Sequence, residues 1–412
     1  MANTNHEKKW SHPALTGSRV KEWSITGGVL FAFLIGIPLL SALPSDDAWY
    51  KISNFRLNLL GKFLSFAIVA VGLNLAWGYT GILSLGQGVY FGLGAYIMGM
   101  YLLLKVGVAG HYESVLPDFM VWNGLTEMPL FWRPMYYAAV ALPLVIIVPV
   151  VASIGLGYLT FKSRVRGVYF AIVTQATAMI LVLTLIGNQP YTGGTNGLND
   201  FRTIFGMPLR GPDLPKTEFI LYLATVVILF GAYVLSRWIV RSKLGRVLTA
   251  IRDDEQRVRF TGYDVANFKI FIFAVAAAFA GIGGACFVPQ VGIIAPANVG
   301  IVPSIEMTLW VAVGGRGTLV GPVIGAILVN SCKSGFSEVY PGSWLYFLGA
   351  LFLGVVVLFP QGVAGIARFF RRSRVGEKTL AETTVTTDGG KKINKFFSKL
   401  TLKKHKGKRK ES

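Results

Sequence analysis

The apolar run EFILYLATVVILFGAYVLSRWIV, residues 218–240, leads directly into the charged stretch RSKLGRVLTAIRDDEQRVRF, residues 241–260. The first stretch is as long as the roughly 20 residues that an α-helix needs to cross the hydrocarbon core of a membrane. The second stretch must return to water or to a partner, because charged side chains are costly in lipid. Since cytoplasmic loops are rich in Lys and Arg, the join predicts a membrane helix that ends inside the cell.

The composition extends this interpretation to the whole chain of 412 residues. Hydrophobic residues make up 53% of it and charged residues 15%, with a mean hydropathy of +0.55, whereas soluble domains carry about 25% charged residues. This excludes an ordinary soluble enzyme and predicts an all-α, polytopic membrane protein with about ten transmembrane segments, some short or glycine-broken. The spans are expected near 25–43, 57–77, 89–107, 136–160, 167–187, 218–240, 268–288, 300–313, 319–332 and 343–361.

The net charge of +20 is concentrated at the C-terminus. Residues 366–412 hold fifteen basic and four acidic side chains, which is 15 − 4 = 11 of the 20 charges. We expect a cytoplasmic tail at 1–24, a transmembrane domain at 25–365 with a charged loop at 241–267, and a basic cytoplasmic tail at 366–412. Such a tail is typical of a topology signal that contacts anionic lipid headgroups, and it lacks the interleaved aromatics of a nucleic-acid site.

Two glycine-rich segments interrupt the apolar pattern. GYTGILSLGQG, residues 78–88, and GGRGTLVGP, residues 314–322, share the spacing G-x-x-G-x-L. A single helix from 305 to 332 would leave the basic tail outside, whereas two short segments, or a re-entrant loop with one crossing, place it inside. Either arrangement makes the second segment non-helical backbone at membrane depth, and paired broken segments are typical of a transporter's pathway.

The sequence contains no catalytic or metal-binding pattern and no phosphate-binding loop. We therefore expect a non-enzyme that binds no cofactor, and any ATP must be used by another chain. Lys62 and Lys105 lie near span ends and can extend to the interface, which leaves Glu306 as the main intramembrane charge, unless it starts a helix outside. Neutral polar side chains usually bond neighbouring helices, but they also suit the pathway of an uncharged polar solute. The candidates for the pathway are Asn74, Gln87, Thr174, Gln175 and Glu306, with Gln175 first.

The charged stretch also has a helical pattern. Leu244, Val247, Leu248, Ile251 and Val258 fall on one face of a helix, and Gly262 suits its C-terminal cap. We expect a short amphipathic helix that either lies among lipid headgroups or docks on a soluble partner; its acidic residues weaken the first alternative.

Longer segments resemble a known family. GRVLTAIRDDEQRVRFTGYDVANFKIFIFAVAAAFAGIGGA resembles the coupling loop and following helix of permeases from ABC importers of the branched-chain amino acid type, and GYTGILSLGQGVYFGLGAY resembles their early motif. The similarity covers residues 55–365. RGVYFAIVTQATAMI, GGTNGLNDF and EMTLWVAVGGRGTLVGPVIGAILVN look like the urea-type permease, the C subunit of the urea importer. The amino acid branch commonly has an acidic residue where this chain offers residues 175–178, a departure that fits an uncharged solute.

The resemblance implies a permease of an ATP-driven importer for urea or a short amide in the inner membrane. Its partners would be a second permease, two ATP-binding subunits and an extracytoplasmic solute-binding protein. A branched-chain amino acid permease is the nearest alternative, and a secondary transporter or channel without ATPases is the alternative of another class. Carried onto this chain, ATPase coupling would fall to Gly245, Arg246, Ala250, Ile251, Arg252, Asp253, Asp254, Glu255 and Gly262.

Overall fold

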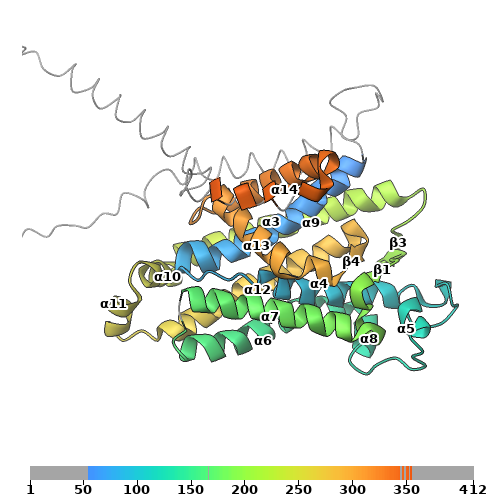
Figure 1. Cartoon of the computed structure of the whole chain (residues 1–412), viewed down its shortest axis with the longest axis horizontal. Helices are drawn as coiled ribbons and strands as arrows, with labels where there is room; N and C mark the ends of the chain where they lie inside the picture. The colour runs from blue at the N-terminus through green and yellow to red at the C-terminus, as the bar shows by residue number, and fades with distance from the viewer. Residues whose placement is uncertain (1–53, 166, 344–345, 348, 352, 355–412) are drawn as a thin grey trace, which may run out of the picture. The chain divides into compact units, whose positions relative to one another are not determined.

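The computed structural model describes residues 54–354, except 166, 344, 345, 348 and 352 (Figure 1). The expected span at 25–43, much of the one at 343–361 and both tails lie outside these residues. The long helices are α3 (Asn54–Asn74), α4 (Gln87–Leu104), α6 (Ala138–Lys162), α7 (Val168–Gly187), α9 (Leu214–Arg241), α12 (Val265–Val291), α13 (Ile301–Gly314) and α14 (Gly321–Val339). The short helices are α5 (Asp118–Trp122), α8 (Gln189–Thr192), α10 (Lys243–Asp253) and α11 (Glu255–Phe260).

Within the described residues, seven helices are long and apolar enough to cross a membrane. All seven match expected spans to within a few residues, and the seventh, Pro296–Gly314, joins α13 to the short turn before it. The described part of the chain therefore confirms a helical, multi-pass architecture but not the full count of about ten. α14 does not meet the criterion, because its C-terminal half, NSCKSGFSEV, is polar.

α12 is the central packing partner of the bundle and contacts α3, α4 and α6. Small residues permit this close packing. A Cβ on Gly94 of α4 would lie 2.5 Å from the Cα of Gly281 in α12, and a Cβ on Gly283 would lie 2.8 Å from the Ser65 carbonyl of α3. Helices approach so closely in lipid by van der Waals packing of glycine faces, so these glycines hold the core together.

Both glycine-rich segments are broken, and they lie against each other. The end of α3 continues as a π-helical turn, Leu75–Tyr79, before non-helical backbone that reaches α4. The chain between α13 and α14, residues 315–320, is also non-helical, as the glycine pattern predicted. A Cβ on Gly78 would lie 2.6 Å from the Gly317 nitrogen. The structure thus excludes one continuous helix over 305–332 and packs α13 against α14 as a hairpin.

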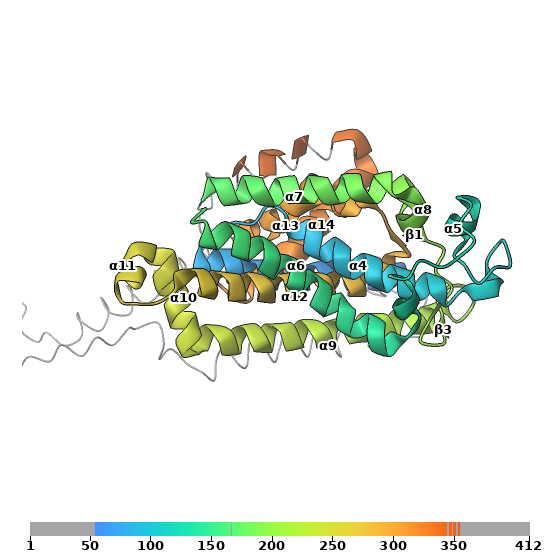
Figure 2. The same ribbon diagram turned by 90° about the horizontal axis from the view of Figure 1, so that it is seen from below.

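The two ends of the bundle differ in character. Figures 1 and 2 both place α10 and α11 at one end and α5, α8 and the short strands at the other. Four two-residue strands add a minor β component: β1 (Leu198–Asn199) pairs antiparallel with β4 (Ile293–Ile294), and β2 (Thr203–Ile204) with β3 (Met207–Pro208). The β1–β4 pair joins the loop after α7 to the connection after α12.

Candidate functional site

The charged stretch after α9 forms two helices, where the hydrophobic spacing predicted one. The break falls at Asp254, whose backbone is extended (φ −157°, ψ 98°) and whose carboxylate accepts hydrogen bonds from the backbone N–H groups of Gln256 and Arg257. This is an N-cap, which satisfies donors that a helix start leaves unpaired. Gly262 closes α11 with a positive φ of 87°, as the sequence predicted for its cap.

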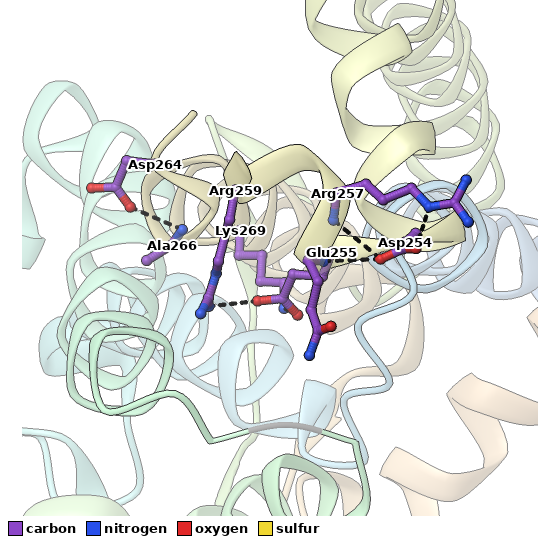
Figure 3. Close-up of polar contacts among 8 residues, drawn as sticks. Asp254, Glu255, Arg257, Arg259, Asp264, Ala266 and Lys269 are labelled. Atoms are coloured by element: carbon purple, nitrogen blue, oxygen red, sulfur yellow. Dashed lines mark hydrogen bonds and ion pairs between the residues drawn. The ribbon is translucent and has the colours of Figure 1, made fainter. Parts of the chain in front are cut away.

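The three acids in this segment have different partners within the chain, and Figure 3 shows two of them, Asp254 and Glu255. Asp253 pairs with Arg252, and Asp254 pairs with Arg257 in addition to capping α11. Glu255 lies 2.7 Å from Arg259 and 2.7 Å from Lys269 of α12, and its side chain is only 16% exposed. Glu255 therefore fastens α11 to the bundle, whereas Asp253 remains on the surface.

The apolar face of α10 and α11 is turned toward the bundle. Leu248 is fully buried, and Ile251 and Val258 form a small cluster with Val265 at the start of α12. The opposite face is exposed and includes Arg246 and Ala250. Phe260, at the end of α11, is 90% exposed, which is unusual for an aromatic side chain and leaves it available to a partner.

Arg252 connects this segment to the broken helices. Its Nη1 donates to the Gly78 carbonyl at 2.9 Å, in the π-helical turn that ends α3. One turn earlier, the Asn74 amide donates to the Thr318 carbonyl at 2.8 Å and accepts from the Gly317 nitrogen at 3.0 Å. Hydrogen bonds thus connect α10 to the end of α3, and the end of α3 to the α13–α14 turn. We call these three bonds the clasp.

A cavity of about 270 Å³ lies between α3, α4, α12, α13 and α14. Its polar wall contains Glu306, whose side chain is 7% exposed and whose two oxygens both lie 2.7 Å from the Lys333 ammonium. Lys62 lines the same space. Its apolar wall is aromatic and is made of Phe66, Phe91, Phe287 and Trp310.

The structure disperses the five pathway candidates. Glu306 lines the cavity, and the other four are not among its described lining residues. Asn74 belongs to the clasp. Gln87 and Thr174 bond to other segments: the Gln87 amide donates to the Ala276 carbonyl at 2.9 Å, and Thr174 accepts from the Leu85 nitrogen. Gln175 is half-buried on α7. The Gln87 Oε1 atom is buried without a hydrogen-bond partner within the described residues.

Sequence reasoning missed Lys333 and underrated Lys62. Lys333 fell one residue beyond the expected end of the span at 332, and Lys62 was assigned to the membrane interface. The available signal was that Lys333 directly follows the span at 319–332 and that Glu306 lies in the span before it, since buried lysines and glutamates are almost always paired.

A bundle of membrane helices with a charged helix pair at one end and broken helices beside it has the architecture of a transport permease. The chain belongs to the family described as "Branched-chain amino acid transport system / permease component", whose model matches residues 55–356. It is therefore a multi-pass permease component of a transporter of this type, and its relatives are permeases rather than enzymes.

Curated relatives agree with the family. The chain is 26% identical to the high-affinity branched-chain amino acid transport system permease protein LivM of Escherichia coli, over 87% of this chain and 79% of that protein. It is 21% identical to BraD of Pseudomonas aeruginosa, also named a high-affinity branched-chain amino acid transport system permease protein, over 73% and 92%. It is 23% identical to the ribose import permease protein RbsC of Escherichia coli, over 77% and 87%. No solved structure matches the chain.

Proposed function

We propose that the chain is the translocating permease of an ATP-driven importer for urea or a related short amide. In this proposal a second permease, two cytoplasmic ATP-binding subunits and an extracytoplasmic solute-binding protein complete the importer. The observation that carries it is the α10–α11 segment. This segment is anchored by a buried face, exposes a second face, and is hydrogen-bonded through Arg252 to the broken end of α3.

The exposed face supplies what docking on an ATPase requires. Arg246, Ala250 and Phe260 are all exposed, and Arg257 is 87% exposed although it pairs with Asp254. Interfaces concentrate their binding energy in a few aromatic and arginine side chains, which favours Phe260 and the arginines as anchors. Because the anchored face is bonded to the broken helices, a push on the exposed face would reach the α13–α14 hairpin.

The choice of urea rests on sequence. The segments around 167–180 and 306–330 resemble the urea-type permease, and residues 175–178 are uncharged where the amino acid branch commonly has an acid. The second candidate is import of a branched-chain amino acid, which is favoured by the names of the relatives LivM and BraD.

Uptake by cells that carry the whole importer tests both candidates. We expect labelled urea to enter at a rate that depends on this chain and on the ATP-binding subunits, and labelled leucine not to enter above background. Leucine uptake in place of urea would support the second candidate. Uptake that persists when both ATP-binding subunits are deleted would refute the ATP-driven mechanism and favour a carrier or channel.

A further inference from the structure

The cavity between α3, α4, α12, α13 and α14 is far from the segment proposed to dock on the ATPase. Lys62 precedes Gly78, the contact of Arg252, by 78 − 62 = 16 residues, which is about 24 Å along α3 at 1.5 Å per residue. The clasp and the cavity nevertheless share α3 and the α13–α14 hairpin. Movement of that hairpin would change the cavity and the α10 contacts together.

The position of α14 indicates that the cavity faces protein or water rather than lipid. α14 packs against α3 and α13, which belong to candidate membrane spans. Yet its C-terminal half exposes Ser331, Cys332 and Glu338, on the helix that also carries Lys333 into the cavity wall. Polar groups at membrane depth face protein or a water-filled space, because lipid cannot hydrogen-bond to them.

The described lining of the cavity carries a small net positive charge. The described lining contains Lys62, Lys333 and Glu306, a formal balance of 2 − 1 = +1. Glu306 and Lys333 neutralise each other at 2.7 Å. Within the part of the chain that the structure describes, the Lys62 ammonium has neither a hydrogen bond nor an ion pair. The Trp310 indole N–H, in the opposite wall, is buried without a hydrogen-bond partner in the same range.

We infer that this cavity is the binding site for the amide solute, an inference that rests on the proposed function. Urea has four N–H donors and one carbonyl acceptor on a flat frame. Glu306 supplies carboxylate oxygens, which are the acceptors that a solute N–H group requires. Lys62 is the donor for the solute carbonyl. The side-chain oxygens of Asn330 and Ser334, also in the lining, can accept the remaining N–H groups.

The aromatic wall complements a flat solute. The Phe66 ring lies 5.3 Å from Phe287, nearly parallel at 28°, and 4.7 Å from Trp310. A planar amide keeps its hydrogen-bonding edge toward the polar wall while its faces lie against these rings. The cavity volume of about 270 Å³ exceeds one urea and leaves room for water, which suits weak binding and rapid passage.

The same charges disfavour an amino acid. Its ammonium group would enter a wall that already holds two lysines and would compete with Lys333 for Glu306, the one carboxylate among the described lining residues. Like charges at close range are repulsive, and more so away from water. A neutral amide meets no such repulsion. A carboxylate that lacks an ammonium would also suit the +1 wall, so the test includes one.

Protection of an engineered thiol tests the site without any need for transport. In the complete importer, held in lipid nanodiscs, Ser334→Cys is introduced in a Cys286→Ala/Cys332→Ser background. The rate of its reaction with an anionic methanethiosulfonate reagent is then measured with urea, acetamide, leucine or 4-methyl-2-oxopentanoate. We expect urea and acetamide to slow the reaction in a saturable way and leucine to leave it unchanged.

Variants then assign the polar contacts. Lys62→Gln and Glu306→Gln should each weaken protection by urea about 10- to 100-fold, as expected when a hydrogen bond to a charged group is lost. Lys105→Gln is the matched control, because Lys105 lies over the Tyr136 ring outside the cavity, and it should leave protection unchanged. If Glu306→Gln fails to fold because Lys333 loses its partner, the double variant with Lys333→Gln removes both charges together and should also lose protection.

The other outcomes overturn the inference. Protection by leucine or by the oxo acid, but not by urea, would assign the cavity to carboxylates. A thiol that does not react, or that reacts equally with every solute present, would show that the cavity is not a binding site. Urea uptake by the whole importer without protection would refute this inference alone. Protection without ATP-dependent uptake would refute the proposed function alone.

Discussion

Replacement of Asn74 by Ala tests the strongest contact between the two broken segments. Asn74 is completely buried, donates to the Thr318 carbonyl at 2.8 Å and accepts from the Gly317 nitrogen at 3.0 Å. The variant would leave both backbone groups without their partner. Each unsatisfied buried group costs about 1–3 kcal/mol. Both bonds are half-buried, so the low end applies to each, and the two together predict a loss of about 2 kcal/mol in the free energy of unfolding.

The measurement is an unfolding titration of the purified protein in mixed micelles, followed by circular dichroism. Asn188→Ala is the matched control, because the Asn188 side chain, directly after the end of α7, makes one exposed bond, to the Thr184 carbonyl at 2.8 Å. We expect that control to stay within about 0.5 kcal/mol of the unsubstituted protein. A loss of less than about 1 kcal/mol for Asn74→Ala would refute the claim that these bonds hold the α13–α14 turn in place.

Three further predictions concern packing, coupling and pH. Gly94→Ala places a Cβ 2.5 Å from the Gly281 Cα, so it should lower the free energy of unfolding by about 1–3 kcal/mol. It should also reduce the monodisperse fraction in size-exclusion chromatography. Ala250→Arg, on an exposed face, should leave folding intact but abolish ATPase stimulation by loaded binding protein; unchanged stimulation would contradict docking at α10. The hydrogen bond from the Lys162 ammonium, 2.7 Å away, holds the pKa of Asp264 below its ordinary value of 3.8. A lowered carboxyl pKa stabilises the folded state at pH values above 3.8, and this stabilisation is lost as the pH falls through the lowered pKa. Asp264→Asn should therefore be less stable than the unsubstituted protein at pH 7 and equally stable in strong acid.

Ile251→Asp is a poor test of coupling, although Ile251 was among the residues expected to contact the ATPase. Its side chain is 3% exposed and packs with Val258 and Val265. A buried aspartate at this position would destabilise the junction of α10, α11 and α12. Loss of activity would then report unfolding of the segment, whereas Ala250→Arg reports docking.

Hydropathy predicted the long helices because the bilayer fixes their length and leaves little freedom in their ends. It failed within the charged stretch, since the spacing from Ile251 to Val258 fits one continuous helix as well as two. Asp254 favours two helices over one, because its carboxylate stabilises a new helix start more than it would a helix interior. The sequence could show that Asp254 is a good cap but not that the chain would turn there.

The site was less predictable than the helices because it depends on contacts between distant segments. Glu306 stood out as a charge within a span, but its pairing with Lys333 requires the hairpin that brings α14 back along α13. Asn74 was selected for its polarity, and the structure adds that both of its polar atoms bond to backbone. Polarity at membrane depth therefore identified residues with important contacts and did not separate those that bond helices from those that line a cavity.

α4 shows how such a bundle must mature in the membrane. In its most apolar 18-residue window, 94% of residues are buried within the protein, compared with 22% in α6. A nascent α4 enters lipid by its hydrophobicity and must later exchange nearly all of its lipid neighbours for other helices. The hydrophobic effect does not drive that second step, because lipid is as apolar as the protein core, so it depends on the close fit of glycine faces. Substitutions at Gly94 or Gly281 should accordingly spare insertion by the translocon and expose the immature chain to membrane proteases.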